Sequence, residues 1–175
     1  MPVVLRLAFE AYPASSPAPV LNTVVPPPAP FVIEVLTVDF DVEQTLNIGS
    51  QSSGAGAGKV TFNPFSIRKR PDAHSAEFWQ RVCSGTPYKK VTLTASRPGA
   101  TSPFFIFTMG LVAIRTLGIS ADETTDMTEL VTFEYGQASY GAAPQNPDGS
   151  MGTLVSTGWD RVKNVQVDAA KVGII

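Results

Sequence analysis

Most of this chain alternates apolar and more polar residues with a period of two. In the first such stretch, residues 3–10, the apolar residues Leu5, Leu7 and Phe9 are separated by single positions. Because successive side chains of a strand point to opposite faces, this pattern predicts half-buried β-strands. Similar stretches, rich in Val, Phe and Thr, are residues 31–46, 59–70, 88–96, 103–120, 127–135 and 150–167. Gly, Pro and Asp turns join them, so the sequence predicts a mainly antiparallel β-protein, either a barrel or a two-sheet sandwich.

One segment has a helical pattern instead. Its apolar residues recur four positions apart, in the pairs Phe78/Val82 and Trp79/Cys83. We therefore predict a helix over about residues 73–84. Asp72 is placed to cap its N-terminus and Gly85 to end it. Glu77 and Arg81 are spaced to form an ion pair on its outer face.

A proline-rich stretch follows the first strand. Residues 12–30 contain seven of the fifteen prolines of the chain, and proline cannot join a sheet interior because it has no N–H to donate. We expect a long extended loop, since the eleven residues before it are too few for a core of their own. The 175 residues suffice for one core, so we expect a single domain over 1–175 that ends in a short apolar tail, 168–175.

Charge and cysteine content narrow the classes of protein. A net charge of -2 and a pI near 5.3 argue against nucleic-acid binding through a broad basic field. The single cysteine, Cys83, cannot form an intrachain disulfide, which fits folding in a reducing compartment. No Sec-type signal is visible, and the longest apolar run, residues 104–114, is too short to span a bilayer as a helix. We expect cytoplasmic synthesis, no membrane insertion, and any export by a route that does not read such a signal.

The stretch "SQSSGAGAGKV", residues 50–60, is a candidate phosphate-binding loop. Such a loop needs a glycine, four residues and then Gly-Lys-Ser/Thr, so that backbone N–H groups surround the phosphates and the hydroxyl reaches magnesium. Here Gly58 and Lys59 have Ser53 at the position of the first glycine. Val60 stands where the hydroxyl should be. We therefore expect no nucleotide or other cofactor, and we interpret the stretch as a connection between two strands.

Asp39, Asp41 and Glu43 alternate along one predicted strand and so share a face. Residues two apart are separated by roughly 7 Å at a rise of about 3.3 Å per residue. Two carboxylates at that spacing could flank a glycosidic bond, as in a hydrolase, or hold calcium. The simpler interpretation, which we favour, is a solvated face of a strand whose other side carries Phe40 and Val42.

The remaining titratable candidates favour structural roles. The acidic cluster of "ADETTDMTE" lacks the glycine and the final acidic residue of a calcium loop, so we interpret it as a solvated turn. Its members are Asp122, Glu123, Asp126 and Glu129. His74, the one histidine, excludes two-histidine zinc sites, and we expect it to be exposed beside Ser75. Cys83 lies near the C-terminal end of the helix, where the dipole disfavours a thiolate, so we expect it to pack on the apolar face.

Basic and aromatic residues give no binding motif either. The run "RKR", residues 68–70, is too short to bind nucleic acid without aromatic platforms beside it. We interpret it as a solvated strand end or a charge contact between subunits. Trp79 and Trp159 are expected in the core or in an interface. No catalytic or metal-binding group emerges from the sequence, so we do not expect an enzyme.

Three motifs follow one another within residues 31–167. They are "GKVTFNPFSIRKRPD", the helix ending in "CSGTPYKKVTLT", and the closing Gly158-Trp159 followed by "NVQV". In this order they resemble the haemolysin co-regulated protein (Hcp) family, the tube proteins of type VI secretion systems. The proline-rich loop over 12–30 and the tail "DAAKVGII" depart from the family pattern.

The resemblance implies a β-barrel of two packed sheets with one flanking helix, similar to phage tail tube proteins. It also implies hexameric rings that stack into a tube inside a contractile sheath, with a spike protein at the tip and effectors in the lumen. Such a protein is assembled in the cytoplasm and then secreted through the type VI apparatus without a Sec signal. Because glycine permits close backbone approach, we hypothesise a contact between stacked rings in the glycine loop. The residues assigned to it are Gly54, Gly56, Gly58 and Lys59.

Three other interpretations stay open at this point. One is the tube of another contractile, phage-derived injection machine. The second is a monomeric β-barrel module that binds a small ligand or a carbohydrate in its interior or on a loop face. The third is a hydrolase that uses Asp39, Asp41 or Glu43.

Overall fold

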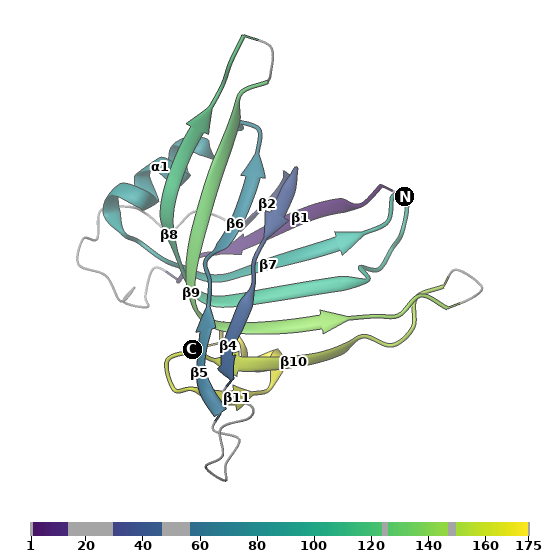
Figure 1. The fold of residues 1–175 in the computed structure, drawn as a ribbon. Coiled ribbons are helices and arrows are strands. Elements are labelled where there is room, and N and C mark those ends of the chain that lie inside the picture. Colours follow the sequence, from purple (N-terminus) through teal and green to yellow (C-terminus); the bar gives the residue numbers. More distant parts are fainter. Residues whose placement is uncertain (1, 14–29, 47–56, 124–125, 147–149, 175) are drawn as a thin grey trace.

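The computed structural model describes residues 2–13, 30–46, 57–123, 126–146 and 150–174. These residues form a mainly β structure with one α-helix and one 3-10 turn (Figure 1), which confirms the predicted fold class. The strands are β1 (Val4–Glu10), β2 (Phe31–Val35), β3 (Thr37–Asp39), β4 (Val42–Leu46), β5 (Ala57–Phe62), β6 (Phe65–Lys69), β7 (Tyr88–Ser96), β8 (Phe105–Ser120), β9 (Thr128–Ala142), β10 (Val155–Asp160) and β11 (Val165–Val167). The helix α1 covers Ser75–Ser84, and the 3-10 turn η1 covers Ala169–Lys171.

Most strands belong to one antiparallel sheet with the order β11-β10-β9-β8-β7-β1-β2. The edge of β9 that faces away from β8 pairs with two strands, β6 along Glu129–Phe133 and β10 along Gln137–Ala142. β2 continues through Leu36 into β3, which pairs with β6. The N–H of Leu36 donates to the carbonyl of Arg68 at 2.8 Å. The sheet therefore bends over the core, but its path keeps two ends, β11 and β2, so the predicted barrel is an open one.

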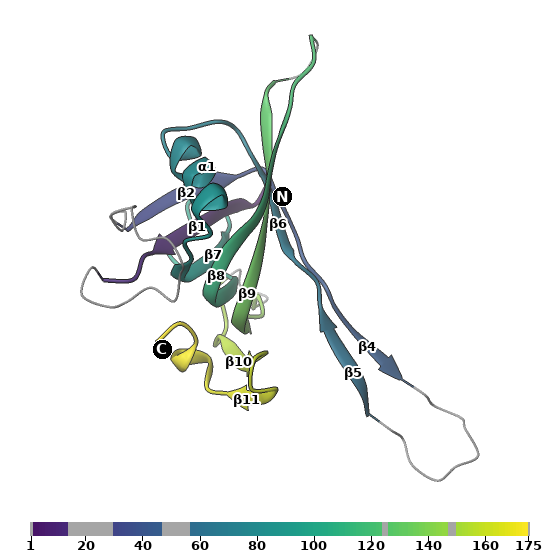
Figure 2. The same cartoon turned by 90° about the vertical axis from the view of Figure 1, so that its left-hand side faces the viewer.

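β4 and β5 form a separate two-stranded sheet, the arm, which projects from the body (Figure 2). Directly paired residues share a face, so Val42 and Phe62 lie on one face of the arm and Glu43 and Thr61 on the other. Val42 is 50% exposed. In the described part of the chain no further strand pairs with the arm. An isolated two-stranded hairpin is only marginally stable in water, so the arm lacks the support that the other strands have.

An aromatic core lies between the bent sheet and α1. Phe9, Phe78 and Phe133 meet there, with ring centroids 5.3 Å apart for Phe9 and Phe78 and 6.4 Å apart for Phe78 and Phe133. All three rings are buried. Other buried core residues are Leu7, Ile33, Phe65, Ile67, Tyr88, Val91, Leu93, Phe107, Met109, Val112 and Val131. Most of them come from alternate positions of their strands, which confirms the half-buried pattern read from the sequence, although Met109 and Val112 of β8 are three positions apart.

α1 uses its faces differently from the prediction. Phe78 is buried, but Trp79 is 61% exposed, so it is not a core residue. Cys83 is exposed as well, and its predicted burial is wrong. Arg81 is buried instead, on the same face of the helix as Phe78. The predicted end at Gly85 is confirmed, because this residue has a φ of 69° and its N–H donates to the carbonyl of Arg81 at 2.9 Å.

The N-terminus of α1 also differs from the prediction. The helix starts at Ser75, and the residue before it, His74, makes no side-chain capping bond. Asp72 therefore does not cap the helix, although its carboxylate accepts a hydrogen bond from the N–H of His74 at 2.8 Å. His74 is half-buried, not exposed as predicted, because its ring stacks on Phe31 with centroids 3.9 Å apart.

Strand boundaries are the other departure. The predicted strand over 31–46 consists of β2, β3 and β4, with breaks at Leu36 and at residues 40–41. On either side of the break at Leu36 the chain pairs with different strands: β2 pairs with β1, and β3 pairs with β6. β9 runs on to Ala142, past the predicted 127–135, since it pairs with β8 along its whole length.

Candidate assembly surfaces

The glycine loop falls largely outside the described residues. Gly54 and Gly56 lie within 47–56, whose structure is not described. Gly58 and Lys59 belong to β5, which begins at Ala57, earlier than the predicted strand start at Lys59. A ring contact through these residues stays a prediction.

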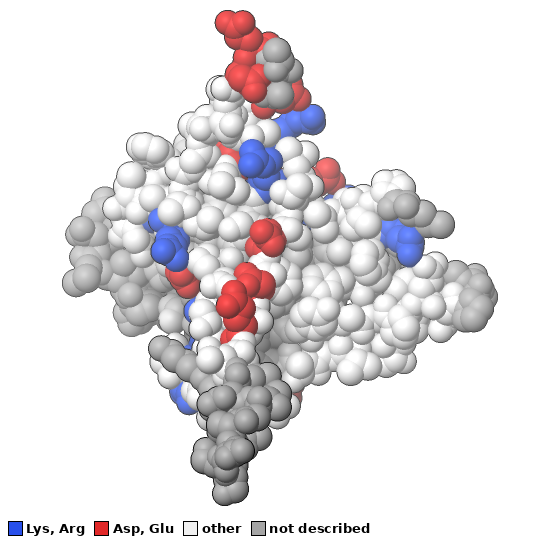
Figure 3. All heavy atoms as spheres, viewed as in Figure 1, with Lys and Arg blue, Asp and Glu red and all other residues white. Residues whose placement is uncertain are grey.

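Acidic residues gather at the base of the arm. Asp39 ends β3, Asp41 lies in the break that follows, and Glu43 is in β4. All three are exposed, as the solvated interpretation predicts. The side-chain amide of Asn63 donates to Asp41 Oδ2 at 2.8 Å and to Glu43 Oε1 at 3.0 Å. Figure 3 shows acidic side chains along this face above the grey end of the arm.

Arg161 joins the base of the arm to the body. Its guanidinium donates to the carbonyls of Tyr135 and Phe62, the latter at 3.1 Å, and lies 3.5 Å from Glu134 Oε2. It also covers the rings of Phe62 and Tyr135, with centroids 5.1 and 4.5 Å away. Burial raises the pKa of Tyr135, whose hydroxyl donates to the carbonyl of Asn63 at 3.4 Å. The arm is therefore fixed at its base.

The three residues of the basic run 68–70 lie in three different environments. Arg68 donates to the Thr128 hydroxyl at 3.1 Å. Arg70 is 66% exposed and pairs with Asp126 at the surface. Lys69 is fully buried and lies 2.7 Å from Glu129 Oε2. The solvated interpretation is therefore wrong for Lys69, and for Glu129 in the acidic cluster.

Lys69 is held by several further groups. Its ammonium lies 3.1 Å from Asp72 Oδ1 and donates to the Ser75 hydroxyl at 3.1 Å and to the carbonyl of Arg70 at 2.9 Å. The Ser75 hydroxyl in turn donates to Glu129 Oε2 at 2.9 Å. These bonds join the beginning of α1 to the β8–β9 hairpin. The burial of Lys69 could have been predicted from the sequence, because Lys69 occupies the next inward-facing position after Phe65 and Ile67 in β6.

A second buried cation joins the other end of α1 to the sheet. Arg81 donates from Nε to Glu77 Oε1 at 2.9 Å and from Nη1 to the carbonyls of Thr86 and Pro87. Its guanidinium lies 3.9 Å from the ring centroid of Tyr88. Burial raises the pKa of Tyr88, so its hydroxyl stays protonated and donates to Glu77 at 2.8 Å. The predicted pair of Glu77 and Arg81 is confirmed, but Arg81 lies on the buried face.

The C-terminal segment, residues 168–174, packs on the protein's own sheet. The N–H of Gly173 donates to Gln137 Oε1 at 3.2 Å, and Gln137 Nε2 donates to Asp160 Oδ2 at 3.0 Å. Val172 and Gly173 are buried. Gly110 makes room for them, since a Cβ at that position would lie 2.7 Å from the nitrogen of Gly173.

A pocket of about 260 Å³ opens beside this segment. We call its exposed rim the C-terminal patch, which consists of Leu111, Val162, Lys89 and Lys163. Val162 is 75% exposed and the side chain of Lys163 is 69% exposed. The patch therefore combines apolar and basic groups. Its residues come from three stretches that the sequence analysis predicted only as strands, 88–96, 103–120 and 150–167.

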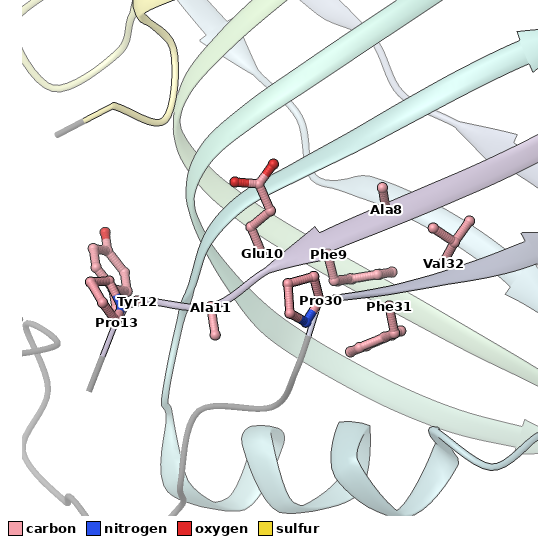
Figure 4. Close-up of a pocket in the computed structure, with 9 residues that line it drawn as sticks. All are labelled: Ala8, Phe9, Glu10, Ala11, Tyr12, Pro13, Pro30, Phe31 and Val32. Carbon is pink, nitrogen blue, oxygen red and sulfur yellow. The ribbon is translucent and has the colours of Figure 1, made fainter.

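A larger, open cleft of about 490 Å³ lies beside β1 and β2 (Figure 4). Pro13 and Pro30, which flank residues 14–29, line it together with Phe9 and Phe31. Its one charged lining residue, Glu10, is already paired with Lys90 Nζ at 2.8 Å. The cleft therefore presents apolar walls and a neutralised carboxylate.

Trp159, in β10, is only half-buried, and its indole Nε1 is inaccessible to solvent. This nitrogen makes no hydrogen bond to the described residues. Within the described ranges, no group of three or more His, Cys, Asp or Glu side chains is close enough to hold a metal ion. No helix among the described residues has the length and apolar character needed to cross a membrane.

A family model described as "Type VI secretion system effector, Hcp" matches residues 31–140. The chain belongs to the Hcp family. This confirms the resemblance of the sequence motifs. The matched range runs from β2 to near the end of β9, so it includes the arm, α1 and both buried cations. The C-terminal segment, residues 168–174, lies wholly beyond it.

Solved structures share the Hcp fold at low sequence identity. A structure described as a type six secretion system protein has a TM-score of 0.77 and 18% identity, covering 95% of this chain and 100% of its own. Hcp1 from Salmonella typhimurium has a TM-score of 0.68 and 15% identity over the same shares of the two chains. The secreted protein Hcp3 from Pseudomonas aeruginosa has a TM-score of 0.55 and 15% identity, covering 89% of this chain and 97% of its own. No curated protein sequence matches the chain.

The contact of the C-terminal segment with the Hcp sheet is expected to weaken in acid. Asp160 accepts hydrogen bonds from the N–H of Lys163 and from Gln137, which lower its pKa below the ordinary value of 3.8. A lowered pKa in the folded state stabilises the fold above the ordinary value, and this contribution disappears as the pH falls through the folded-state pKa. Asp160→Asn should therefore cost about 1–3 kcal/mol at neutral pH and progressively less below pH about 4.

Chemical denaturation at a series of pH values measures this difference. Asp168→Asn is the matched control, because Asp168 also accepts a backbone N–H, that of Ala170, but is exposed. A pH-independent cost for Asp160→Asn would contradict the assignment.

Proposed function

We propose that this Hcp protein is the tube subunit of a type VI secretion system. The subunits form hexameric rings that stack into a tube, and contraction of a surrounding sheath expels the tube. Effectors travel in its lumen or near the spike protein at its tip. The protein is made in the cytoplasm and leaves through the apparatus itself. Its role is structural, and no catalytic step is assigned to Asp39, Asp41 or Glu43.

The arm, which pairs with no further described strand beyond its fixed base, is the observation that carries this proposal. β4 and β5 pair only with each other in the described chain, although two-stranded hairpins are marginally stable alone. The strand path also ends at β2 and β11, and no other described strand pairs with the outer edge of β11 or with that of β2 before it continues into β3. An edge strand of this kind can pair with another chain. A second copy of the chain can cover both features, and different surfaces that meet head to tail close into a ring.

The mass of the protein in solution tests the ring. We expect light scattering to give six times the 18.6 kDa of the chain and negative-stain images to show six-membered rings. A monomer at all concentrations would contradict the proposal and would favour a ligand-binding module.

Bulky residues in the glycine loop should impair stacking but not ring formation. The double variant Gly56→Trp/Gly58→Trp removes the close backbone approach that glycine permits. Electron microscopy should then show single rings under conditions in which the unaltered protein forms tubes. Gly56→Ala/Gly58→Ala is the control, because it adds only a methyl group at each position. Unchanged tubes in the Trp variant would reject the loop as the stacking contact.

A further inference from the structure

β8 changes its inward face at Leu111, a residue of the C-terminal patch. Met109 is buried before this point and Val112 after it, and the pairings of β8 with both neighbouring described strands pass over Leu111. Leu111 has a φ of 52°, a left-handed conformation that bulky side chains rarely adopt. Glycine would allow the same bulge without strain. Leucine at this position therefore indicates a use for its side chain, which is 40% exposed.

The Leu111 side chain forms one wall of the 260 Å³ pocket beside the C-terminal segment. Val162, which is 75% exposed, forms another wall. Gly136 lies between them, since a Cβ there would lie 3.2 Å from Leu111 Cδ2 and 3.6 Å from Val162 Cγ2. The absence of a side chain at Gly136 keeps this apolar slot open. Sites for drug-sized ligands measure roughly 300–1,000 Å³, so this smaller pocket suits a single apolar side chain.

Two lysines lie at the rim of the slot. The side chain of Lys163 is 69% exposed, and Lys89 is half-buried. The one carboxylate among the lining residues is Asp160, which is 2% exposed and accepts hydrogen bonds from Gln137 and from the N–H of Lys163. Lys163 Nζ also lies 4.0 Å from that carboxylate. The pocket therefore favours a ligand with an apolar group inside and an anionic group at the rim.

Tyr12 connects this pocket with the open cleft beside β1 and β2, because it lines both. The walls of the cleft include Phe9, Phe31 and Pro13 (Figure 4). Grooves lined by aromatic side chains are a common binding site for extended peptides. A short acid would occupy the pocket alone, whereas a peptide that ends in the pocket can continue past Tyr12 into the cleft.

We propose that the pocket binds the free C-terminus of a partner polypeptide that ends in an aliphatic residue. The terminal carboxylate lies between Lys89 and Lys163. The last side chain packs between Leu111 and Val162, and the preceding residues run past Tyr12. This inference goes beyond the tube role, and it does not require the ring because every residue of the site belongs to one protomer.

Fluorescence anisotropy with a labelled peptide tests the terminal carboxylate. The probe is fluorescein-Ala-Pro-Ala-Val-Leu with a free carboxylate, and the same peptide with a C-terminal amide is its control. The acid is expected to bind about tenfold more tightly than the amide, or better, because the amide carries no charge to pair with the lysines. Lys89→Gln/Lys163→Gln should lose this preference. Lys171→Gln should keep it, because Lys171 is exposed but lies outside the pocket lining.

Leu111→Asn tests the apolar wall. Asparagine adopts a positive φ more readily than leucine, so the circular dichroism spectrum should stay unchanged. The affinity for the acid peptide should fall about tenfold or more, because a polar group replaces an apolar contact. Ile119→Asn is the matched control, since Ile119 is also an exposed aliphatic residue of β8 but does not line the pocket.

Three results would overturn the proposal. They are equal binding of the acid and the amide, no binding of either peptide at millimolar concentration, and displacement of the probe by isocaproate as readily as by unlabelled peptide. Isocaproate has the carboxylate and the branched chain without a peptide backbone, so the last result would assign the pocket to a small acid. The ring is tested separately: a monomer that binds the acid peptide would keep this inference and contradict the proposed ring.

Discussion

Lys69→Met is expected to lower the free energy of unfolding by about 3–5 kcal/mol. Lys69 is fully buried, with its ammonium 2.7 Å from Glu129 and 3.1 Å from Asp72. Methionine fills a similar volume but leaves the carboxylate of Glu129, which is 5% exposed, without its cation. The Ser75 hydroxyl then remains as a neutral donor to that carboxylate. A buried charge that loses its partner costs several times what a surface pair contributes.

Denaturant unfolding gives the cost, and the neighbouring residue provides the control. Arg70→Met breaks a pair with Asp126 in which both side chains are well exposed, so we expect about 0–1 kcal/mol. The double variant Lys69→Met/Glu129→Leu removes both charges and should recover most of the lost stability. If Lys69→Met costs no more than Arg70→Met, the buried pair does not stabilise the junction of α1 and the β8–β9 hairpin.

Phe78→Ala is expected to cost about 3–5 kcal/mol, because it removes a fully buried ring and leaves a cavity that the rigid sheet cannot fill. Phe78 contacts aromatic rings from different strands, with its centroid 5.3 Å from Phe9, 6.5 Å from Tyr88 and 6.4 Å from Phe133. It is therefore the main apolar contact between α1 and the sheet. Alanine is the better helix former, so the cost measures packing and not helix propensity.

Trp79→Ala, one position along, is the matched control. Trp79 is larger but 61% exposed, so its removal should change the free energy of unfolding by less than about 0.5 kcal/mol. Thermal or denaturant unfolding compares the two variants. Equal costs would mean that α1 docks through a different face from the one described.

The strands and the helix were largely predictable from the sequence, because their patterns are local. Alternation in β1, β6 and β7 reports directly which residues face the core. Gly85 ends α1 as predicted, since its φ of 69° is a conformation that glycine adopts easily. The motifs from residue 58 onward also indicated the Hcp family, which the match to residues 31–140 confirms.

Side-chain environments were harder to predict from the same patterns. The solvated interpretation of residues 68–70 was wrong for Lys69, because composition indicates solvation whereas the alternation of β6 points this residue inward. Arg81 and Cys83 lie two positions apart on α1, yet the polar residue is buried and the cysteine is exposed. Arg81 is buried because Glu77 and two carbonyls accept hydrogen bonds from its guanidinium, which also lies against the ring of Tyr88. Those partners cannot be assigned from helix periodicity.

The sequence by itself determined that this protein is antiparallel β with one helix, since periodicity and turn residues act over a few neighbouring positions. Its motifs also carried the resemblance to the Hcp family that the family match confirms. The tertiary structure alone decided which strand edges stay free, that β4 and β5 leave the body as an arm, and that Leu111 and Val162 meet two lysines beside the C-terminal segment. It also decided that Lys69 lies opposite Glu129 on the neighbouring strand β9 and forms an ion pair with it. Each of these depends on contacts between residues far apart in the chain, where burial and charge pairing are set by the register of strands and not by any local pattern.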